Sequence, residues 1–205
     1  MPWRGYHPAA RATSSRPAGG LWYVGPMRLE TIDDPDDPRL ASYRELTRAG
    51  RAPRQDVFVV EGARAVRQLI GSRFPVRSLL LGTGSVEDLR ADVARLGDAT
   101  PVYVASRTAL REVTGFHFDG GHLALGERVP EPALDDLLAP AGDRAVVVME
   151  RLANPDNVGG VLRNAATFGA AAAFLSPGCA DPLYRRAIRV SMGGALVVPF
   201  ATPAA

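Results

Sequence analysis

A polar, glycine-containing segment between a predicted strand and a predicted helix carries the residues best suited to chemistry. The segment Glu150–Gly169 reads ERLANPDNVGGVLRNAATFG and follows the apolar run AVVVM at 145–149. Loops at the carboxyl ends of parallel strands are where α/β sheets bind ligands. The free N–H groups at the start of the next helix favour an anion or the phosphate of a nucleotide.

Two side chains in this segment could act together. We expect a helix over Gly159–Phe168, with Asn157 in the loop just before it and Arg163 six residues after Asn157. Six residues make roughly two helical turns, so the two side chains are expected to project near one another. Arg163 stands among small and apolar residues, where an unpaired buried charge is costly, so it needs a partner or a solvent-filled cleft. The competing interpretation is that Asn157 only shapes a turn and Arg163 pairs with an acid such as Glu150.

Other motifs in the chain predict little chemistry. The segment lacks the Gly-x-Gly-x-x-Gly spacing and a Gly-Lys-Ser/Thr sequence, which disfavours the common dinucleotide and P-loop sites. His117, Asp119 and His122 surround a Gly-Gly pair and are expected to form a turn before a strand, not a metal site. Cys179 has no base near it in sequence and is expected to be a passive thiol.

Length and composition are those of an ordinary globular protein. The 205 residues are 46% hydrophobic and 22% charged, which excludes a disordered acidic tail, collagen and a disulfide-framed miniprotein. A single cysteine cannot form an internal disulfide, and no apolar run approaches the length of a membrane span. Without an apolar signal-peptide centre at the N-terminus, we expect a cytoplasmic protein.

Charge is distributed unevenly along the chain. All 24 basic residues are arginine, and the formal net charge is +2. The segment 38–77 contains nine arginines against three acids, and such a local excess suits a polyanionic partner. Within it, Arg48, Arg51 and Arg54 lie at a predicted helix end and in the loop that follows. We expect this group to contact a polyanion such as a nucleic acid, with a solvated helix face as the alternative.

The order of α and β patterns predicts two α/β units. Residues 1–26 show no periodicity and are expected to be a disordered extension, from an upstream sequence or a mis-assigned start before Met27. Residues 27–128 form the first unit, 129–143 a Pro- and Ala-rich linker, and 144–205 the second unit.

Capping residues and periodicity place the elements within these units. Predicted strands are 57–60, 76–81, 102–104, 122–126, 145–149, 171–175 and 196–200. Predicted helices begin at Asp37-Pro38, Ala63, the capping-box-like Ser85-x-x-Asp88, Ser106, Gly159 and Asp181-Pro182. The strand at 145–149 is continuously apolar, as in parallel sheets covered on both faces.

Three stretches resemble the SpoU (TrmH-type) RNA ribose methyltransferases. NPDNVGGVLRNAATFG at 154–169 resembles the first motif of that family, and CADPLYRRAIRVSMGGA at 179–195 resembles the segment after its second strand. FVVEG at 58–62, followed by a helix, resembles the family's N-terminal substrate-binding domain. The resemblance spans roughly residues 38–200.

This resemblance implies a fold and an activity. The fold would be a ribosomal-protein-like α/β substrate-binding domain plus an α/β-knot methyltransferase domain of the SPOUT type, assembled as a homodimer. The activity would be methyl transfer from S-adenosylmethionine to a ribose 2′-hydroxyl of structured RNA, with rRNA favoured over tRNA. The resemblance assigns activation of that hydroxyl to Arg163 and positioning to Asn157. Because guanidinium resists deprotonation, electrostatic stabilisation of the alkoxide is easier than base catalysis.

A second group of arginines follows the second strand of that unit. Arg185, Arg186 and Arg189 share one predicted helix, and Arg185 and Arg189 are neighbours one turn apart. They are candidates for gripping the RNA backbone, with a solvated helix face as the equal alternative.

The chain also departs from the family pattern. The Leu-Gly-x-Glu-Gly motif and the later Ser-Leu-Asn motif, which supply most of the cofactor pocket, do not occur before Ala205. We therefore expect an incomplete knot, cofactor-binding residues beyond position 205, and a fragment that is inactive alone. The alternative functions are a non-catalytic RNA-binding fragment and an enzyme that grips another nucleotide at Asn157–Gly160.

Overall fold

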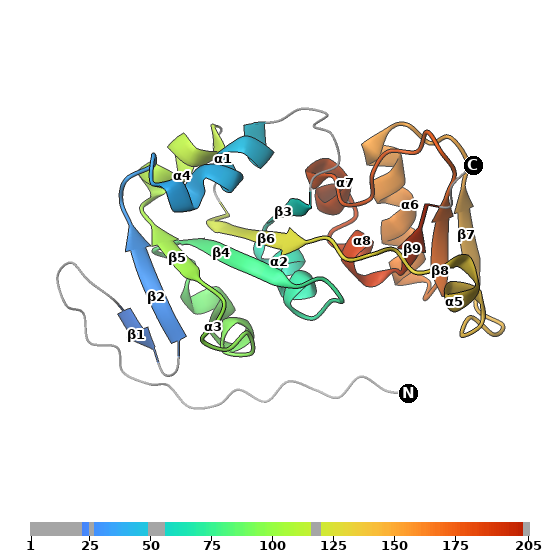
Figure 1. The fold of residues 1–205 in the computed structure, drawn as a ribbon, viewed down its shortest axis with the longest axis horizontal. Coiled ribbons are helices and arrows are strands. Elements are labelled where there is room, and N and C mark those ends of the chain that lie inside the picture. The colour runs from blue at the N-terminus through green and yellow to red at the C-terminus, as the bar shows by residue number, and fades with distance from the viewer. Residues whose placement is uncertain (1–21, 25–26, 49–55, 116–119, 203–205) are drawn as a thin grey trace.

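The computed structural model describes residues 22–24, 27–48, 56–115 and 120–202, and these form two sheets (Figure 1). The first sheet has six strands in the order β1-β2-β5-β4-β6-β3, and the second has three in the order β7-β8-β9. Helices flank both sheets, so the α/β class predicted from the alternating patterns is confirmed.

The bounds of the elements are as follows. The strands are β1 (Trp22–Val24), β2 (Met27–Ile32), β3 (Val57–Glu61), β4 (Val76–Gly82), β5 (Val102–Ala105), β6 (His122–Glu127), β7 (Val146–Met149), β8 (Ala172–Leu175) and β9 (Phe200–Ala201). The α-helices are α1 (Ala41–Arg48), α2 (Ala63–Ile70), α3 (Arg90–Val93), α4 (Arg107–Thr114), α5 (Leu134–Leu138), α6 (Pro155–Thr167), α7 (Arg185–Val190) and α8 (Gly194–Val197). Short 3₁₀ turns, η1 (Pro38–Leu40) and η2 (Glu87–Leu89), precede α1 and α3.

The first sheet mixes parallel and antiparallel pairs. Strands β2, β5 and β4 run parallel, whereas β1, β6 and β3 pair antiparallel with their neighbours. Helices α1 and α4 cover one face, and α2 and α3 cover the other (Figure 1). On the first of these faces Tyr43 is fully buried, and its hydroxyl lies 2.8 Å from Ser78 Oγ. Burial raises the pKa of Tyr43 well above its ordinary value.

Most predicted elements of this unit form where the sequence places them. Helix α2 has the predicted bounds, and α4 begins after Ser106, whose Oγ accepts a hydrogen bond from Ala109 N at 3.2 Å. Asp37 caps η1 and accepts two bonds from the Arg39 guanidinium, at 3.0 and 2.6 Å. That hydrogen bonding lowers the pKa of Asp37 to about 2.

Two predictions for this unit differ from the structure. Trp22–Val24 form β1 within the stretch expected to lack structure, because they pair with the edge of β2. The capping box at Ser85 is wrong: η2 starts only at Glu87, and no side chain caps it. The carboxylate of Asp88 lies instead 3.2 Å from Nε2 of the buried His122.

The second sheet is parallel throughout, with α6 packed against it. Strand β7 was predicted to be covered on both faces, but it lies at an edge and Val148 is 74% exposed. The predicted strand 196–200 is also wrong, because its first residues continue α8 and only Phe200–Ala201 form β9. A short apolar run does not by itself distinguish a strand from a buried helix.

The helix predicted to have Asp181 as its cap and Pro182 as its first residue begins three residues later than Pro182. Asp181 Oδ1 accepts from Leu183 N at 2.9 Å, which makes a turn, and α7 begins only at Arg185.

The two units share one core and several polar contacts. Phe58 and Leu69 of the first unit belong to the same buried cluster as Leu162 and Phe200 of the second. The segment 129–143, expected to be a linker, contacts the second unit: the carboxylate of Glu131 accepts a hydrogen bond from Thr202 N at 2.6 Å. No helix in the described part of the chain has the length and apolar character that a membrane crossing requires.

One ion pair at the junction is largely shielded from water. Arg185 Nη2 and Nε both donate to Glu61 Oε2, at 2.7 and 3.0 Å, and their side chains are 19% and 13% exposed. We expect Arg185→Ala to lower the free energy of unfolding by about 1.5–3 kcal/mol, because the carboxylate left behind loses charged hydrogen bonds in a poorly hydrated place. Urea unfolding measures this loss.

A matched control is available on the same helix. Arg186 pairs with Asp156, but these side chains are 60% and 35% exposed, so Arg186→Ala should lower the free energy of unfolding much less than Arg185→Ala does. In a protein that carries both Arg185→Ala and Glu61→Ala, the loss in free energy of unfolding should be smaller than the sum of the two single losses. Additive losses would contradict a direct interaction across the junction.

Candidate functional site

Helix α6 starts earlier than the sequence predicts and brings Asn157 inside its first turn. Asn154 is the cap: its Oδ1 accepts from Asp156 N at 2.9 Å, and Pro155 takes the first helical position. A proline there sacrifices no helical hydrogen bond, since the first N–H groups have no partner within the helix. Asn157 therefore lies on a regular helix, not in the loop before it.

Asn157 and Arg163 are both exposed. Six helical residues at about 100° each leave their Cβ directions about 120° apart around the axis, so the expected convergence does not follow from the helix. No hydrogen bond or ion pair joins either side chain to another residue that the structure describes. The proposed pairing of Arg163 with Glu150 is therefore not formed, and Arg163 keeps its charge available to a ligand.

The predicted RNA-binding arginines have different surroundings. On α7, Arg185 is held by Glu61 and Arg186 by Asp156, while Arg189 is exposed with no partner among the described residues. In the other group, Arg51 and Arg54 lie outside the described residues, as does the side chain of Arg48. Their contact with RNA stays a prediction.

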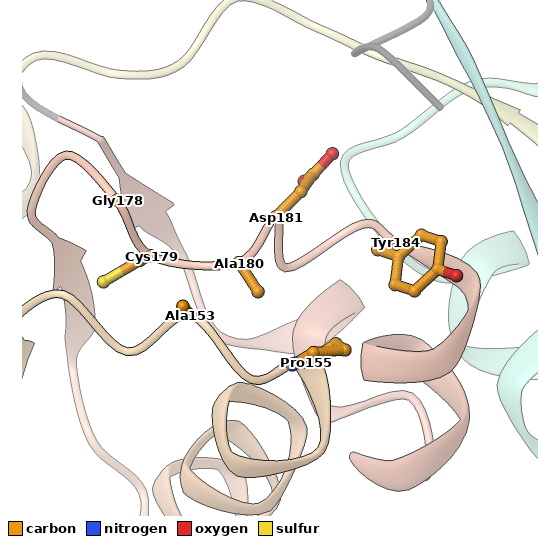
Figure 2. A pocket seen from close by; sticks show the side chains of 7 residues that line it. All are labelled: Ala153, Pro155, Gly178, Cys179, Ala180, Asp181 and Tyr184. Carbon is orange, nitrogen blue, oxygen red and sulfur yellow. The ribbon is translucent and has the colours of Figure 1, made fainter. Parts of the chain in front are cut away.

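A pocket lies at the carboxyl ends of β7 and β8, beside the start of α6 (Figure 2). Its volume is about 280 Å³. Seven residues from the two loops and the start of α6 line it: Ala153, Pro155, Gly178, Cys179, Ala180, Asp181 and Tyr184. The position agrees with the rule that placed a ligand at the ends of parallel strands. Sequence reasoning missed these residues because most are small and apolar and carry no chemical signal.

Hydrogen bonds fix the loops around this pocket. Cys179 Sγ accepts from Leu152 N and donates to Met149 O, both at 3.3 Å, so the thiol bridges the two loops. The Asp181 carboxylate accepts from the Arg128 guanidinium of the first unit as well as from Leu183 N. Of the titratable groups on this rim, Cys179 and Asp181 therefore already have partners within the protein.

No cluster of three metal-binding side chains occurs among the residues described. Of the candidates near the Gly-Gly turn, His117 and Asp119 lie outside those residues, and His122 is buried beside Asp88.

The second unit matches a known family. Residues 144–204 fit the SpoU rRNA Methylase family, and this range contains α6, the pocket and Arg163. Over these residues the chain is similar to the SpoU rRNA Methylase family. The resemblance read from the motif at 154–169 is thereby confirmed.

Individual relatives agree with this similarity. The chain is 40% identical over 182 residues to uncharacterized tRNA/rRNA methyltransferases of Mycobacterium tuberculosis and Mycobacterium bovis. The match covers 87% of this chain and 62% of theirs. The match thus spans 62% of the length of these curated relatives.

Solved structures share the fold. An AdoMet-bound rRNA methyltransferase from Sinorhizobium meliloti superposes with a TM-score of 0.68 at 22% identity, covering 85% of this chain and 64% of that one. An RNA 2′-O ribose methyltransferase gives 0.66 at 24% identity, covering 85% and 66%. Both units of this chain therefore take part in a fold that these two solved structures share.

Proposed function

We propose that this protein is an RNA methyltransferase that transfers a methyl group from S-adenosylmethionine to a ribose 2′-hydroxyl of structured RNA. Ribosomal RNA is the first candidate and tRNA the second. The observation that carries the proposal is Arg163, which is exposed and unpaired among the described residues on the helix that begins the matched family region.

Arg163 would act on the charge that develops on the hydroxyl. A ribose hydroxyl is a weak acid and a poor nucleophile until its proton leaves. A guanidinium remains protonated, so Arg163 stabilises the forming alkoxide electrostatically and does not take the proton itself. Asn157, near the start of α6, offers an amide that can hold the ribose. Because Arg163 has no ion pair with any residue that the structure describes, no such bond must break before it meets the substrate.

S-adenosylmethionine is the cofactor that the family implies, and it supplies the methyl group on a sulfonium. The pocket in Figure 2 does not suffice for it, because the walls are mostly Ala, Pro and Gly and the Asp181 carboxylate is already bonded. The cofactor-binding residues are therefore proposed to lie outside the described part of the chain.

The same proposal assigns roles to the two units. Residues 27–128 would be the ribosomal-protein-like substrate-binding domain, 129–143 the connection, and 144–205 the first part of an α/β-knot methyltransferase domain. We further propose a cytoplasmic homodimer. Arg48, Arg51 and Arg54 would contribute RNA contacts from the first unit.

Methyl transfer to RNA tests this function. Because this chain is expected to be inactive alone, the test uses a full-length protein, one that contains this chain and has the length of its curated relatives. It is incubated with methyl-labelled S-adenosylmethionine and either rRNA or tRNA, and the digested RNA is analysed for 2′-O-methyl nucleosides. Label in such a nucleoside supports the proposal, and its presence in one RNA only names the substrate. RNA binding without any label would instead favour a non-catalytic RNA-binding protein.

A further inference from the structure

The pocket at the carboxyl ends of β7 and β8 has one aromatic group in an otherwise small and mostly apolar lining. Tyr184 carries the only aromatic ring among the seven lining residues, and it lies at the same end of the pocket as Pro155 (Figure 2). At about 280 Å³ the pocket is slightly smaller than the sites of drug-sized ligands, which measure about 300–1,000 Å³. It therefore suits a smaller group, and a planar ring that stacks on Tyr184 matches its chemistry.

An arginine in an unfavourable backbone conformation lies against the other end of this pocket. Arg151 has a φ of +48°, and it is one of two non-glycine residues with positive φ in the described part of the chain. Its N–H donates to Ser176 Oγ at 2.9 Å, which helps to hold that conformation. Its side chain passes beside the pocket, since a Cβ built on Gly178 would lie 4.0 Å from Arg151 Cγ. Residues held in such a conformation cost free energy and concentrate at ligand sites.

The guanidinium of Arg151 is available to an anion. Arg151 is exposed, and its side chain makes no hydrogen bond or ion pair with a residue that the structure describes. A guanidinium binds phosphate oxygens through paired, charge-assisted hydrogen bonds. The pocket thus has an aromatic end and a cationic rim, which together match a nucleotide: the faces of its base stack on aromatic rings, and its phosphate is an anion.

Two carboxylates at the pocket do not oppose such a phosphate. Asp181 is paired with Arg128 of the first unit, and Asp156, next to Pro155, is paired with Arg186. Each of these negative charges is therefore already balanced by an arginine other than Arg151.

The pocket also adjoins the helix that carries Arg163. Pro155 is the first residue of α6, and Arg163 follows eight residues later, about 12 Å further along the axis at about 1.5 Å per residue. The Cα–Cβ bonds of a helix tilt toward its N-terminus, so the Arg163 side chain leaves α6 in the direction of the end where the pocket lies. A strand with one nucleotide in the pocket would have a nearby ribose within the region that Arg163 serves.

We propose that this pocket binds one unpaired nucleotide of the RNA, with its base stacked on Tyr184 and its phosphate held by Arg151. Proteins bind single-stranded RNA by this combination of base stacking on aromatic rings and cationic contacts to the backbone. The bound nucleotide fixes the strand relative to Arg163. This rests on the proposed function only in naming RNA as the source of the nucleotide.

The fluorescence of a base analogue tests the stacking without requiring catalysis. The probe is a single-stranded oligouridine of about 10 nucleotides with one central 2-aminopurine, a purine that stacks more strongly than uracil. Binding of this chain should quench its emission, because the analogue stacks on Tyr184. Tyr184→Phe should behave as the wild type does. Tyr184→Leu keeps an apolar side chain but should lose the quenching and about 5- to 150-fold in affinity, the loss expected for one base stack.

Salt dependence tests the phosphate contact. Arg151→Ala should lower the slope of log K against log salt by about 0.7, the value for one phosphate of a single strand. Arg151→Gly should lower it equally but should unfold at a higher Tm than Arg151→Ala, because glycine adopts a positive φ without strain. Arg107→Ala removes an exposed arginine on α4 of the first unit and should keep the wild-type slope.

Two further titrations identify what occupies the pocket. Adenosine 5′-monophosphate should displace the analogue and restore its emission, whereas S-adenosylmethionine should not. When the probe is annealed to its complement, Tyr184→Leu should no longer change the affinity, because a paired base cannot enter the pocket. Emission restored by S-adenosylmethionine would assign the pocket to the cofactor and overturn the proposal.

The remaining outcomes separate this site from the proposed function. Equal quenching by the wild type and Tyr184→Leu, a wild-type slope in Arg151→Ala, or no binding of the probe by the wild type would overturn the nucleotide site. Loss of quenching and of slope in these variants, without methyl transfer by a full-length protein, would keep the site and overturn the proposed function. Methyl transfer with unaltered binding in the variants would do the reverse.

Discussion

Replacing Arg163 with alanine is expected to lower the rate of methyl transfer by about 10²–10³-fold, the effect of losing one group that stabilises a developing oxyanion. RNA affinity should stay nearly unchanged, because the loss falls on the transition state and not on the bound substrate. Turnover of labelled S-adenosylmethionine by the full-length protein, alongside RNA titrations, measures both quantities. The side chain is exposed and unpaired among described residues, so the fold should not suffer.

Two variants make this result specific. Arg163→Lys keeps a positive charge but not the planar guanidinium, so it should recover part of the rate. Arg107→Ala removes another exposed arginine, on α4 of the first unit, and should leave turnover unchanged. If Arg163→Ala turns over at the wild-type rate, the role assigned to this side chain is wrong.

Adjacent glycines on α6 should respond in opposite directions to alanine. A Cβ on Gly159 would lie 2.7 Å from Ala187 O and 2.9 Å from Val190 Cβ, where α7 crosses α6. Backbone must move to admit it, so we expect Gly159→Ala to destabilise the protein by about 1–3 kcal/mol. Thermal unfolding should show the loss, at roughly 2–4 °C per kcal/mol for a chain of this size.

Gly160→Ala is the matched control, one residue along the same helix. A Cβ there meets nothing within 4 Å, so the variant gains helix propensity without a clash. It should stabilise the protein by about 0.5–1 kcal/mol. Equal destabilisation by both variants would show that the close approach of α6 and α7 does not decide the cost at Gly159.

The two glycines also show where sequence reasoning ends. The pair Gly159-Gly160 is visible in the sequence, but nothing local distinguishes the residue that must be small from the one that need not be. The difference arises from α7, whose closest backbone atom is 28 residues away along the chain, at Ala187. Only the packed helices decide which glycine is required.

The N-terminal boundary of α6 was misplaced for a related reason. The sequence Asn-Pro-Asp-Asn was interpreted as a loop, yet Asn154 and Pro155 are a cap and a first helical residue. The same signals were recognised correctly at Asp37-Pro38. At Asn154 the same residues were interpreted as a ligand-binding loop, so their capping role was not recognised. The helix begins at Pro155, four residues earlier than predicted.

Local patterns determined much of this protein from the sequence alone. Apolar periodicity and capping residues placed β3, α2, β4, β5, α4 and β6 within about one residue, because each of these signals acts within a turn or a strand. The motif around Arg163 identified the family for the same reason, since its residues are contiguous in the chain.

Only the tertiary structure decided which charges are free. Arg185, Arg186 and Arg189 are indistinguishable in sequence, but Glu61 lies 124 residues from Arg185 and Asp156 lies 30 residues from Arg186. A carboxylate so distant in sequence contacts its arginine only after the chain has folded. Packing thereby neutralised two members of this group and left Arg189 exposed, without a partner among the described residues.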